Sequence, residues 1–183
     1  MAEHVTELRT ERLTLRRWRD SDLAPWAAMN ADPGVREHLG DPLTREQSDA
    51  SVARFEAVFD RRGYGWWAVE VRATGGFVGF AGLDDVDEGM PFTGVEIGWR
   101  LARPAWGHGY ATEAARTVLA HGFDVLALRE VLAVTTAANL RSRAVMGRIG
   151  MTRDPADDFD DPAAPEGPLR PNVLYRITRG AKS

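Results

Sequence analysis

Alternating hydrophobic and polar positions predict the first elements of the chain. Leucines alternate with polar residues from Arg12 to Arg17, which is typical of a strand with one buried face. Asp20 or Ser21 is suited to cap a helix that runs to about residue 30. Thr44 and Gln47 form a capping-box pattern, and this pattern predicts a second helix that runs to about residue 62.

Shorter apolar runs in the middle of the chain have the composition of strands. We expect strands at Trp66–Val71, Phe77–Leu83 and Gly94–Leu101, with a glycine turn at residues 74–76 between the first two. The hydrophobic period then lengthens and predicts a helix that begins near Gly109. The apolar stripe of this helix consists of Ala111, Ala114, Ala115, Val118, Leu119 and Leu126.

The remaining third of the chain continues the alternation of elements. We expect a strand at Val131–Thr135, a helix from Asn139 to about Ile149 and a last strand at Val173–Thr178, with one more near Met151. Residues 154–171 hold five prolines and six acidic residues, which is typical of an irregular loop. The order β-α-α-β-β-β-α-β-α-β indicates an α/β (α+β) fold, in which helices cover a mixed sheet.

Composition narrows the class of protein. A length of 183 residues fits one domain, which we expect to span residues 1–183. The absence of cysteine excludes disulfides and a cysteine nucleophile, and the four histidines lack the spacing of a metal site, so we expect no metal. The net charge of −4 gives no reason to expect nucleic-acid binding. The N-terminus lacks the apolar core of a signal peptide and no apolar run approaches ~20 residues, so we expect a cytoplasmic protein without a membrane partner.

The most informative stretch is the glycine turn that follows the strand ending at Leu101. Gly107 and Gly109 permit a positive φ, and the helix that begins after them offers unpaired N–H groups to an anion such as a pyrophosphate. A dinucleotide fingerprint is excluded because Thr112 stands where a third glycine is needed. A Walker loop is excluded because no Gly-Lys-Ser/Thr ending follows. A purely structural Gly-x-Gly turn stays open.

Four segments in this order resemble the GNAT superfamily of N-acetyltransferases, and within it the Rim-type branch that includes ribosomal-protein N-terminal acetyltransferases. The segments are Glu11–Arg16, Glu96–Trp99, Trp106–Ala114 and Asn139–Ser142 continuing to Ile149–Met151. They span nearly the whole chain. The resemblance implies the GNAT fold, a mixed central sheet of about six to seven strands that is splayed between its fourth and fifth strands and flanked by about four helices.

The resemblance also implies acetyl-CoA, a CoA thioester, as the cosubstrate. The family's phosphate motif, Gln/Arg-x-x-Gly-x-Gly/Ala, matches Trp106 through Ala111, and Trp106 departs from its first position. In the family the pantetheine arm pairs with the backbone in the splay. Asn139 and Ser142 match residues near CoA and its sulfur, although both residue types also cap helices. The implied cofactor-binding residues are Ile97, Trp99, Leu101, Trp106, Gly107, His108, Gly109, Tyr110, Ala111, Thr112, Asn139 and Ser142.

Acetyl transfer to an amine needs a neutral amine, a polarised carbonyl and a stabilised thiolate. An α-amine with a pKa near 8 is about one-tenth neutral at pH 7, whereas a lysine amine is under about one-thousandth neutral. Glu96 is the candidate base, although it could equally be solvated or paired with Arg100 on the same strand face. Ser142 is the candidate donor to the leaving sulfur. His108 and Tyr110 occupy variable positions of the turn and are less suited to catalysis.

The acceptor site is less sharply defined. Aromatic residues and the first two helices, which form the acceptor wall in the family, give candidate substrate contacts at Trp26, Met29, Asn30, Trp66 and Phe92. Aromatic residues more often belong to a core. Relatives tend to have histidine where Asp161 and Asn172 stand, which would imply a different acceptor here. The acidic loop could bind a cationic acceptor or could simply be solvated.

We therefore expect an acetyl-CoA-dependent N-acetyltransferase in which a primary amine attacks the thioester directly. The acceptor would be a small-molecule amine or a protein N-terminus. The alternatives are a noncatalytic acyl-CoA-binding module on the same fold and a transferase of another acyl group such as succinyl, with Arg100 or Arg143 near the thioester. A homodimer is compatible with the resemblance.

Overall fold

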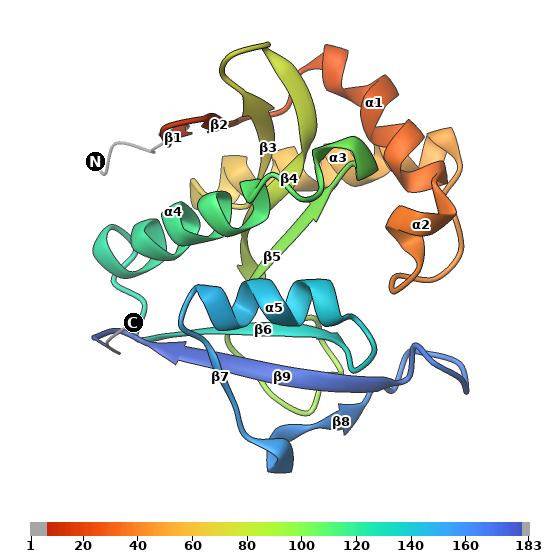
Figure 1. Cartoon of the computed structure of the whole chain (residues 1–183), viewed down its shortest axis with the longest axis vertical. Coiled ribbons are helices and arrows are strands. Elements are labelled where there is room, and N and C mark those ends of the chain that lie inside the picture. Colours follow the sequence, from red (N-terminus) through yellow and green to blue (C-terminus); the bar gives the residue numbers. More distant parts are fainter. Residues whose placement is uncertain (1–6, 181–183) are drawn as a thin grey trace.

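The computed structural model describes residues 7–180, which form one mixed sheet with helices packed on both faces (Figure 1). The strand order is β1-β2-β3-β4-β5-β6-β9-β7, and β8 pairs with β9. The strands are β1 (Leu8–Arg9), β2 (Leu13–Arg16), β3 (Trp66–Val71), β4 (Gly76–Asp85), β5 (Val95–Leu101), β6 (Glu130–Thr136), β7 (Thr152–Arg153), β8 (Phe159–Asp160) and β9 (Pro171–Thr178). The helices are α1 (Asp20–Ala31), α2 (Pro33–Arg36), α3 (Arg45–Arg62), α4 (Tyr110–Asp124) and α5 (Leu140–Arg148), with 3₁₀ turns at Arg103–Ala105 and Pro155–Asp157.

The sheet consists of two antiparallel halves that meet between β5 and β6. β5 pairs with β4 along its whole length, and β6 pairs in the same way with β9. The two parallel strands β5 and β6 share only the pair Glu96 and Leu132. Beyond that pair the strands diverge toward their C-terminal ends, as Figure 1 shows. The expected GNAT fold with a splayed sheet is therefore confirmed.

Two hydrophobic clusters hold the helices against the sheet. On one face, α4 and α5 pack on the strands through Val118 and Met146, beside Trp67 and Ile97. On the other face, the cluster around Trp26 joins α1, α2 and α3 to β3 and β4. Because side chains alternate along a strand, the strand residues that face α4 alternate with those that face α1. No helix formed by residues 7–180 is long and apolar enough to cross a membrane.

Most predicted elements are present with shifts of one or two residues. The predicted capping box begins α3, because the Thr44 hydroxyl accepts from the Gln47 N–H at 3.1 Å and the Gln47 amide accepts from the Thr44 N–H at 2.8 Å. Within residues 7–180 the sheet has nine strands instead of about six to seven, and there are five α-helices instead of about four. The additional elements β1, α2 and β8 have two to four residues, too few for a periodic pattern.

The prediction that the first long strand buries one face is wrong. All four residues of β2 are buried, including the polar side chain of Arg16. The Arg16 guanidinium donates two hydrogen bonds to Asp22 of α1, at 2.8 and 3.0 Å, and one to Glu70 of β3 at 2.8 Å. The hydrogen bond to Asp22 raises the pKa of Arg16 even though burial opposes it. These ion pairs join α1, β2 and β3 where the alternation alone predicts a solvated residue.

Replacing Asp22 by Asn should lower the free energy of unfolding by about 3 kcal/mol, because it leaves a buried guanidinium without its main counter-charge. Urea unfolding measures this change. Asp49→Asn is the matched control, since Asp49 pairs with Arg45 on the exposed surface of α3. That control should change the free energy by less than about 0.5 kcal/mol. Equal effects of the two substitutions would contradict a role for the buried ion pairs.

Candidate active site

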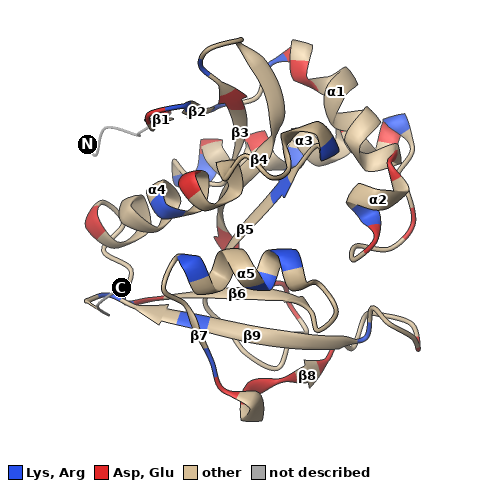
Figure 2. Cartoon of the chain, viewed as in Figure 1, with Lys and Arg blue, Asp and Glu red and all other residues tan. Residues whose placement is uncertain are grey.

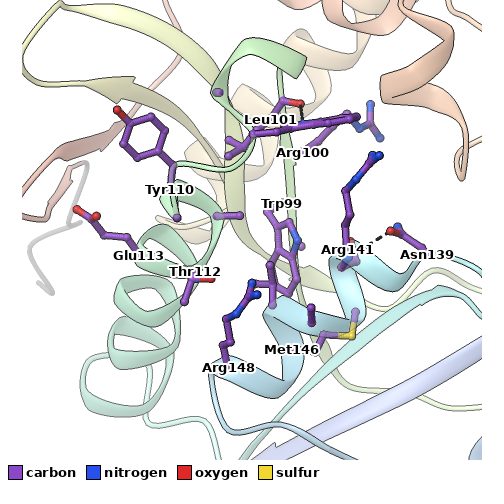
Figure 3. A pocket seen from close by; sticks show the side chains of 18 of the residues that line it. Trp99, Arg100, Leu101, Tyr110, Thr112, Glu113, Asn139, Arg141, Met146 and Arg148 are labelled. Carbon is purple, nitrogen blue, oxygen red and sulfur yellow. Dashed lines mark hydrogen bonds between the residues drawn. The ribbon is translucent and has the colours of Figure 1, made fainter.

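A cavity of about 1260 Å³ lies where β5 and β6 diverge, bordered by the first turns of α4 and α5. It exceeds the ~300–1,000 Å³ of most ligand pockets, so it suits a long ligand. Figure 3 shows Trp99 between α4 and α5 in this cavity. Eleven of the predicted cofactor-binding residues line it: Ile97, Trp99, Leu101, Trp106, Gly107, Gly109, Tyr110, Ala111, Thr112, Asn139 and Ser142.

The glycine turn at the start of α4 forms one wall of the cavity. Gly107 and Gly109 both have a φ of +79°, in the left-handed region that favours glycine. A Cβ atom at Gly107 would meet no heavy atom within 4 Å, so the backbone there is open to a ligand. Gly109 caps α4 without a side-chain hydrogen bond, and the first N–H groups of this helix are therefore available to an anion.

Arg12 and Glu113 hold this turn against β2. The Arg12 side chain donates to the His108 carbonyl at 2.9 Å and to the Glu113 carboxylate at 2.7 Å, and its guanidinium lies over the Tyr110 ring. Burial opposes ionisation of Glu113, but hydrogen bonds from Thr10 and Arg12 outweigh it and lower the pKa of Glu113. The two sequence segments around Arg12 and Glu113 are thus one structural unit, although about a hundred residues separate them.

Basic side chains of α5 reach into the cavity from its other wall (Figure 3). The Arg141 guanidinium carbon lies 4.2 Å from the centroid of the Trp106 ring, whose Nε1 donates to the Leu101 carbonyl. Arg148 lines the cavity at the C-terminal end of the helix. Neither arginine forms an ion pair within residues 7–180, so both are available to an anionic ligand. Figure 2 shows that α5 carries several basic residues along its length.

Asn139 and Ser142 lie together at the start of α5. The Asn139 side chain accepts from the Ser142 N–H at 3.2 Å, and its amide donates to the Thr135 hydroxyl at 2.9 Å. Asn139 therefore caps the helix and ties it to the end of β6. Both residues also line the cavity, so the capping role and a ligand contact are compatible.

Glu96 lies at the one residue pair that joins β5 to β6, at the closed end of the splay. It does not line the cavity, but the neighbouring residues Ile97 and Gly98 do. Burial, together with the negative charges of Asp87 and Asp84, raises the pKa of Glu96 to about 7. Glu96 makes no ion pair with Arg100 or with any other of the described residues.

The expected acceptor residues lie outside the cavity lining. Trp26, Met29 and Asn30 are buried in the cluster between α1 and the sheet or beside it. The Trp66 ring covers Gly98 of β5, because a Cβ atom at Gly98 would lie 3.0 Å from it. Phe92 packs against Phe159 of β8, with ring centroids 5.1 Å apart.

The remaining candidates have local structural partners. His108 stacks on Tyr110 and does not line the cavity. The Asp161 carboxylate accepts from the Ala163 N–H, and the Asn172 side chain donates to the carbonyls of Leu169 and Arg170. In the acidic loop, Asp157, Asp158 and Asp160 form ion pairs with arginines, and residues 154–171 do not line the cavity. Among residues 7–180, no group of three His, Asp or Glu side chains could hold a metal ion.

Comparison with known proteins agrees with this geometry. The family model described as "Acetyltransferase (GNAT) domain" matches residues 12–152. The "FsC-acetyl coenzyme A-N(2)-transacetylase" of Aspergillus fumigatus is 36% identical over 82% of this chain and 67% of its own length. The uncharacterized protein YkkB of Bacillus subtilis is 32% identical over 80% of this chain and 85% of its own.

A solved structure gives the same result. The acetyltransferase of Agrobacterium tumefaciens is 28% identical and superposes with a TM-score of 0.77, covering 96% of this chain and 95% of its own. The matched family model spans the splayed strands, the glycine turn and the start of α5. The chain therefore belongs to the acetyltransferase (GNAT) family and is an acetyl-CoA-dependent N-acyltransferase.

Proposed function

We propose that the protein transfers the acetyl group of acetyl-CoA to a primary amine, on a small molecule or a protein N-terminus. The observation that carries the proposal is the cavity between β5 and β6, because it runs from the glycine turn of α4 to the strand on which Glu96 lies. The name of the Aspergillus relative, which describes acetyl transfer to a nitrogen, supports an amine acceptor. The Rim-type branch stays part of this proposal, since the matched model describes GNAT domains in general.

The residues around the cavity fit CoA. The open backbone at Gly107 and Gly109 and the uncapped N-terminus of α4 suit the pyrophosphate. Arg141 and Arg148 provide positive charge for the remaining phosphate, and unpaired backbone groups of β5 suit the amides of the pantetheine arm. Trp99 and Met146 supply apolar contact along the arm. Asn139 and Ser142 would contact the end of the arm near the sulfur.

Glu96 is the proposed base. The neutral amine attacks the thioester carbon, a C–N bond forms and the C–S bond breaks, and the amine proton passes to Glu96 directly or through water. Ser142 protonates or hydrogen-bonds the leaving thiolate, and N–H groups of β5 polarise the carbonyl oxygen. A carboxyl with a pKa near 7 is well matched to accept a proton at neutral pH, whereas an ordinary glutamate with a pKa near 4.3 is a weaker base.

The glycine turn gives a direct test of the cofactor site. Gly107→Ala should weaken acetyl-CoA binding by about tenfold or more, because its methyl group stands where the phosphates approach the backbone. Isothermal titration calorimetry measures the affinity. Gly89→Ala is the matched control, since Gly89 also has a positive φ and open space but does not line the cavity.

Both substitutions should cost about 1 kcal/mol of stability, because alanine is strained in the left-handed region. Only the substitution at Gly107 should change the affinity. Equal affinities for the two variants would contradict the placement of the phosphates in this turn.

The pH dependence of acetyl transfer tests the role of Glu96. Because the base must be ionised, kcat/KM should rise with pH through an apparent pKa near 7. Glu96→Gln should abolish this rise, the acidic limb of the pH profile, and should lower kcat by about a hundredfold. Asp87→Asn should move the limb to lower pH, since removing a nearby negative charge lowers the pKa of Glu96.

Asp85→Asn is the control for that shift. Asp85 pairs with Arg62, and its charge does not contribute to the raised pKa of Glu96. The titration of the amine itself gives a separate limb near pH 8 or above. A limb near pH 7 that survives in Glu96→Gln would exclude Glu96 as the base.

A further inference from the structure

Arg100 is a cavity residue for which acetyl transfer to a simple amine provides no role. It lies on β5 and lines the cavity. Because side chains alternate along a strand, Arg100 shares one face with Gly98 and Glu96, opposite to Ile97, which packs in the cluster under α4. On the Arg100 side the cavity is bounded by Val35 of α2 and by the loop that follows it.

The Arg100 guanidinium has no counter-charge among the described residues. It donates one hydrogen bond to the Asn30 side chain at 2.8 Å, and its Nε has no partner although it is buried. The rings of Trp26 and Phe80 lie 5.3 and 5.4 Å from it. Arg16, which is more completely buried at 4% exposure, has two carboxylate partners. A buried cation without a carboxylate is costly unless a ligand supplies the charge.

A second guanidinium adds to the positive potential at this end. Burial is the main cause that lowers the pKa of Arg100 to about 10, and the charge of Arg36 contributes to this shift, so the two cations lie close enough to repel each other. Arg100 is still charged at neutral pH. Arg36 donates its own hydrogen bonds to the backbone carbonyls of Asp41 and Leu39, which are neutral. An anion at Arg100 would relieve this repulsion.

The orientation of Arg100 is fixed from behind by a chain of hydrogen bonds. The Trp26 indole donates to the Ser51 hydroxyl, which in turn donates to the Ser48 carbonyl. The Asn30 amide donates to the Ser48 hydroxyl at 3.2 Å, and this leaves its oxygen for Arg100. A guanidinium held in one orientation loses little side-chain entropy when it binds a ligand.

The same face of β5 lies beside a group of carboxylates at its other end. Glu96 lies beside the charges of Asp84 and Asp87, four residues along the strand from Arg100. The Trp66 ring covers Gly98, which lies between Glu96 and Arg100 on the strand. The carboxylates beside the proposed base and the guanidinium of Arg100 thus lie at opposite ends of one strand face, an arrangement that complements a molecule with an amine and an anionic group.

We propose that Arg100 binds a carboxylate of the acceptor, so that the preferred acceptors are amines that also carry a carboxylate. This inference rests on the proposed function and specifies its substrate class. A carboxylate on the acyl donor, as in succinyl-CoA, is the other source of the same chemistry. The acceptor is favoured because Arg100 lies on the face of β5 opposite to α4, whose first turn is the proposed anchor of CoA.

The test compares a series of ω-amino acids of increasing length with their carboxamides, which keep the amine and lose the charge. For the preferred length, the wild-type protein should acetylate the amino acid with a kcat/KM about tenfold or more above that of its amide, the effect expected of a hydrogen-bonded ion pair. Release of CoA and the mass of the product measure the transfer. Succinyl-CoA and acetyl-CoA are compared as donors in parallel.

Arg100→Gln should lower kcat/KM for the amino acid about tenfold more than for its amide, mainly through KM. Arg100→Lys should retain part of the preference for the amino acid over its amide, because lysine keeps the positive charge but cannot form a bidentate pair with a carboxylate. Arg45→Gln removes an exposed arginine of α3 that does not line the cavity and should leave the preference unchanged. Calorimetric titration with acetyl-CoA shows that each variant is folded and binds the cofactor.

Three results would overturn the inference and leave acetyl transfer standing. They are equal use of amino acids and amides by the wild-type protein, an unchanged preference in both Arg100 variants, and a preference for succinyl-CoA that Arg100→Gln abolishes. The last result would move the carboxylate to the donor. Absence of transfer to every amine of the series and to a peptide N-terminus, by protein that binds acetyl-CoA, would overturn the proposed function and this inference together.

Discussion

The site depends on one constraint, the single residue pair that joins β5 to β6. Each of these strands is fully paired on its outer side, β5 with β4 and β6 with β9, so neither can rotate to close the gap. Past Glu96 and Leu132, the facing backbone groups of the two strands have no strand partner. Buried backbone N–H and C=O groups need hydrogen bonds, and an extended ligand with amide groups can supply them. The open sheet is in this sense a preformed binding site.

The helices that follow the diverging strands place charge at the mouth of the gap. α4 begins after the glycine turn and α5 after Asn139, and both N-termini border the cavity. Their aligned N–H groups, together with Arg141 and Arg148, make this region suited to phosphates. Arg12 and Glu113 keep the turn in place from β2. The geometry of the proposed cofactor site is thus set by backbone conformation and by ion pairs behind it, and this is compatible with Trp106 at the first motif position.

Local patterns were sufficient to predict the parts of the fold that depend on neighbouring residues. The capping box of Thr44 and Gln47 and the glycine turn at 107–109 involve contacts within a few residues, and the structure has both. Pairings between distant segments could not be predicted in the same way. Arg16 was expected on a solvated face because nothing near it in sequence shows that Asp22 and Glu70 converge on it. The contact of Arg12 with Glu113 and the isolation of Arg100 likewise appear only when the strands are assembled.

The candidate site shows the same difference between features that depend on neighbouring residues and features that depend on distant segments. Most cofactor-binding candidates came from two continuous motifs, and eleven of them line one cavity. The acceptor candidates rest on aromatic residue type and on the acceptor wall that the resemblance implies, and Trp26 and Asn30 instead form the layer that holds Arg100. A buried polar residue that positions another is hard to recognise from sequence, because its pattern is the same as that of an ordinary core position.

The central claim is that CoA occupies the gap between β5 and β6 as an additional strand. Hydrogen–deuterium exchange with and without CoA tests it most directly, because exchange reports the hydrogen bonding of backbone amides. CoA should slow exchange in residues 97–101 of β5 and in residues 107–112 of the glycine turn, and should leave residues 68–71 of β3, which are paired with both β2 and β4, unchanged. Saturating CoA binding without protection of residues 97–101 would contradict it.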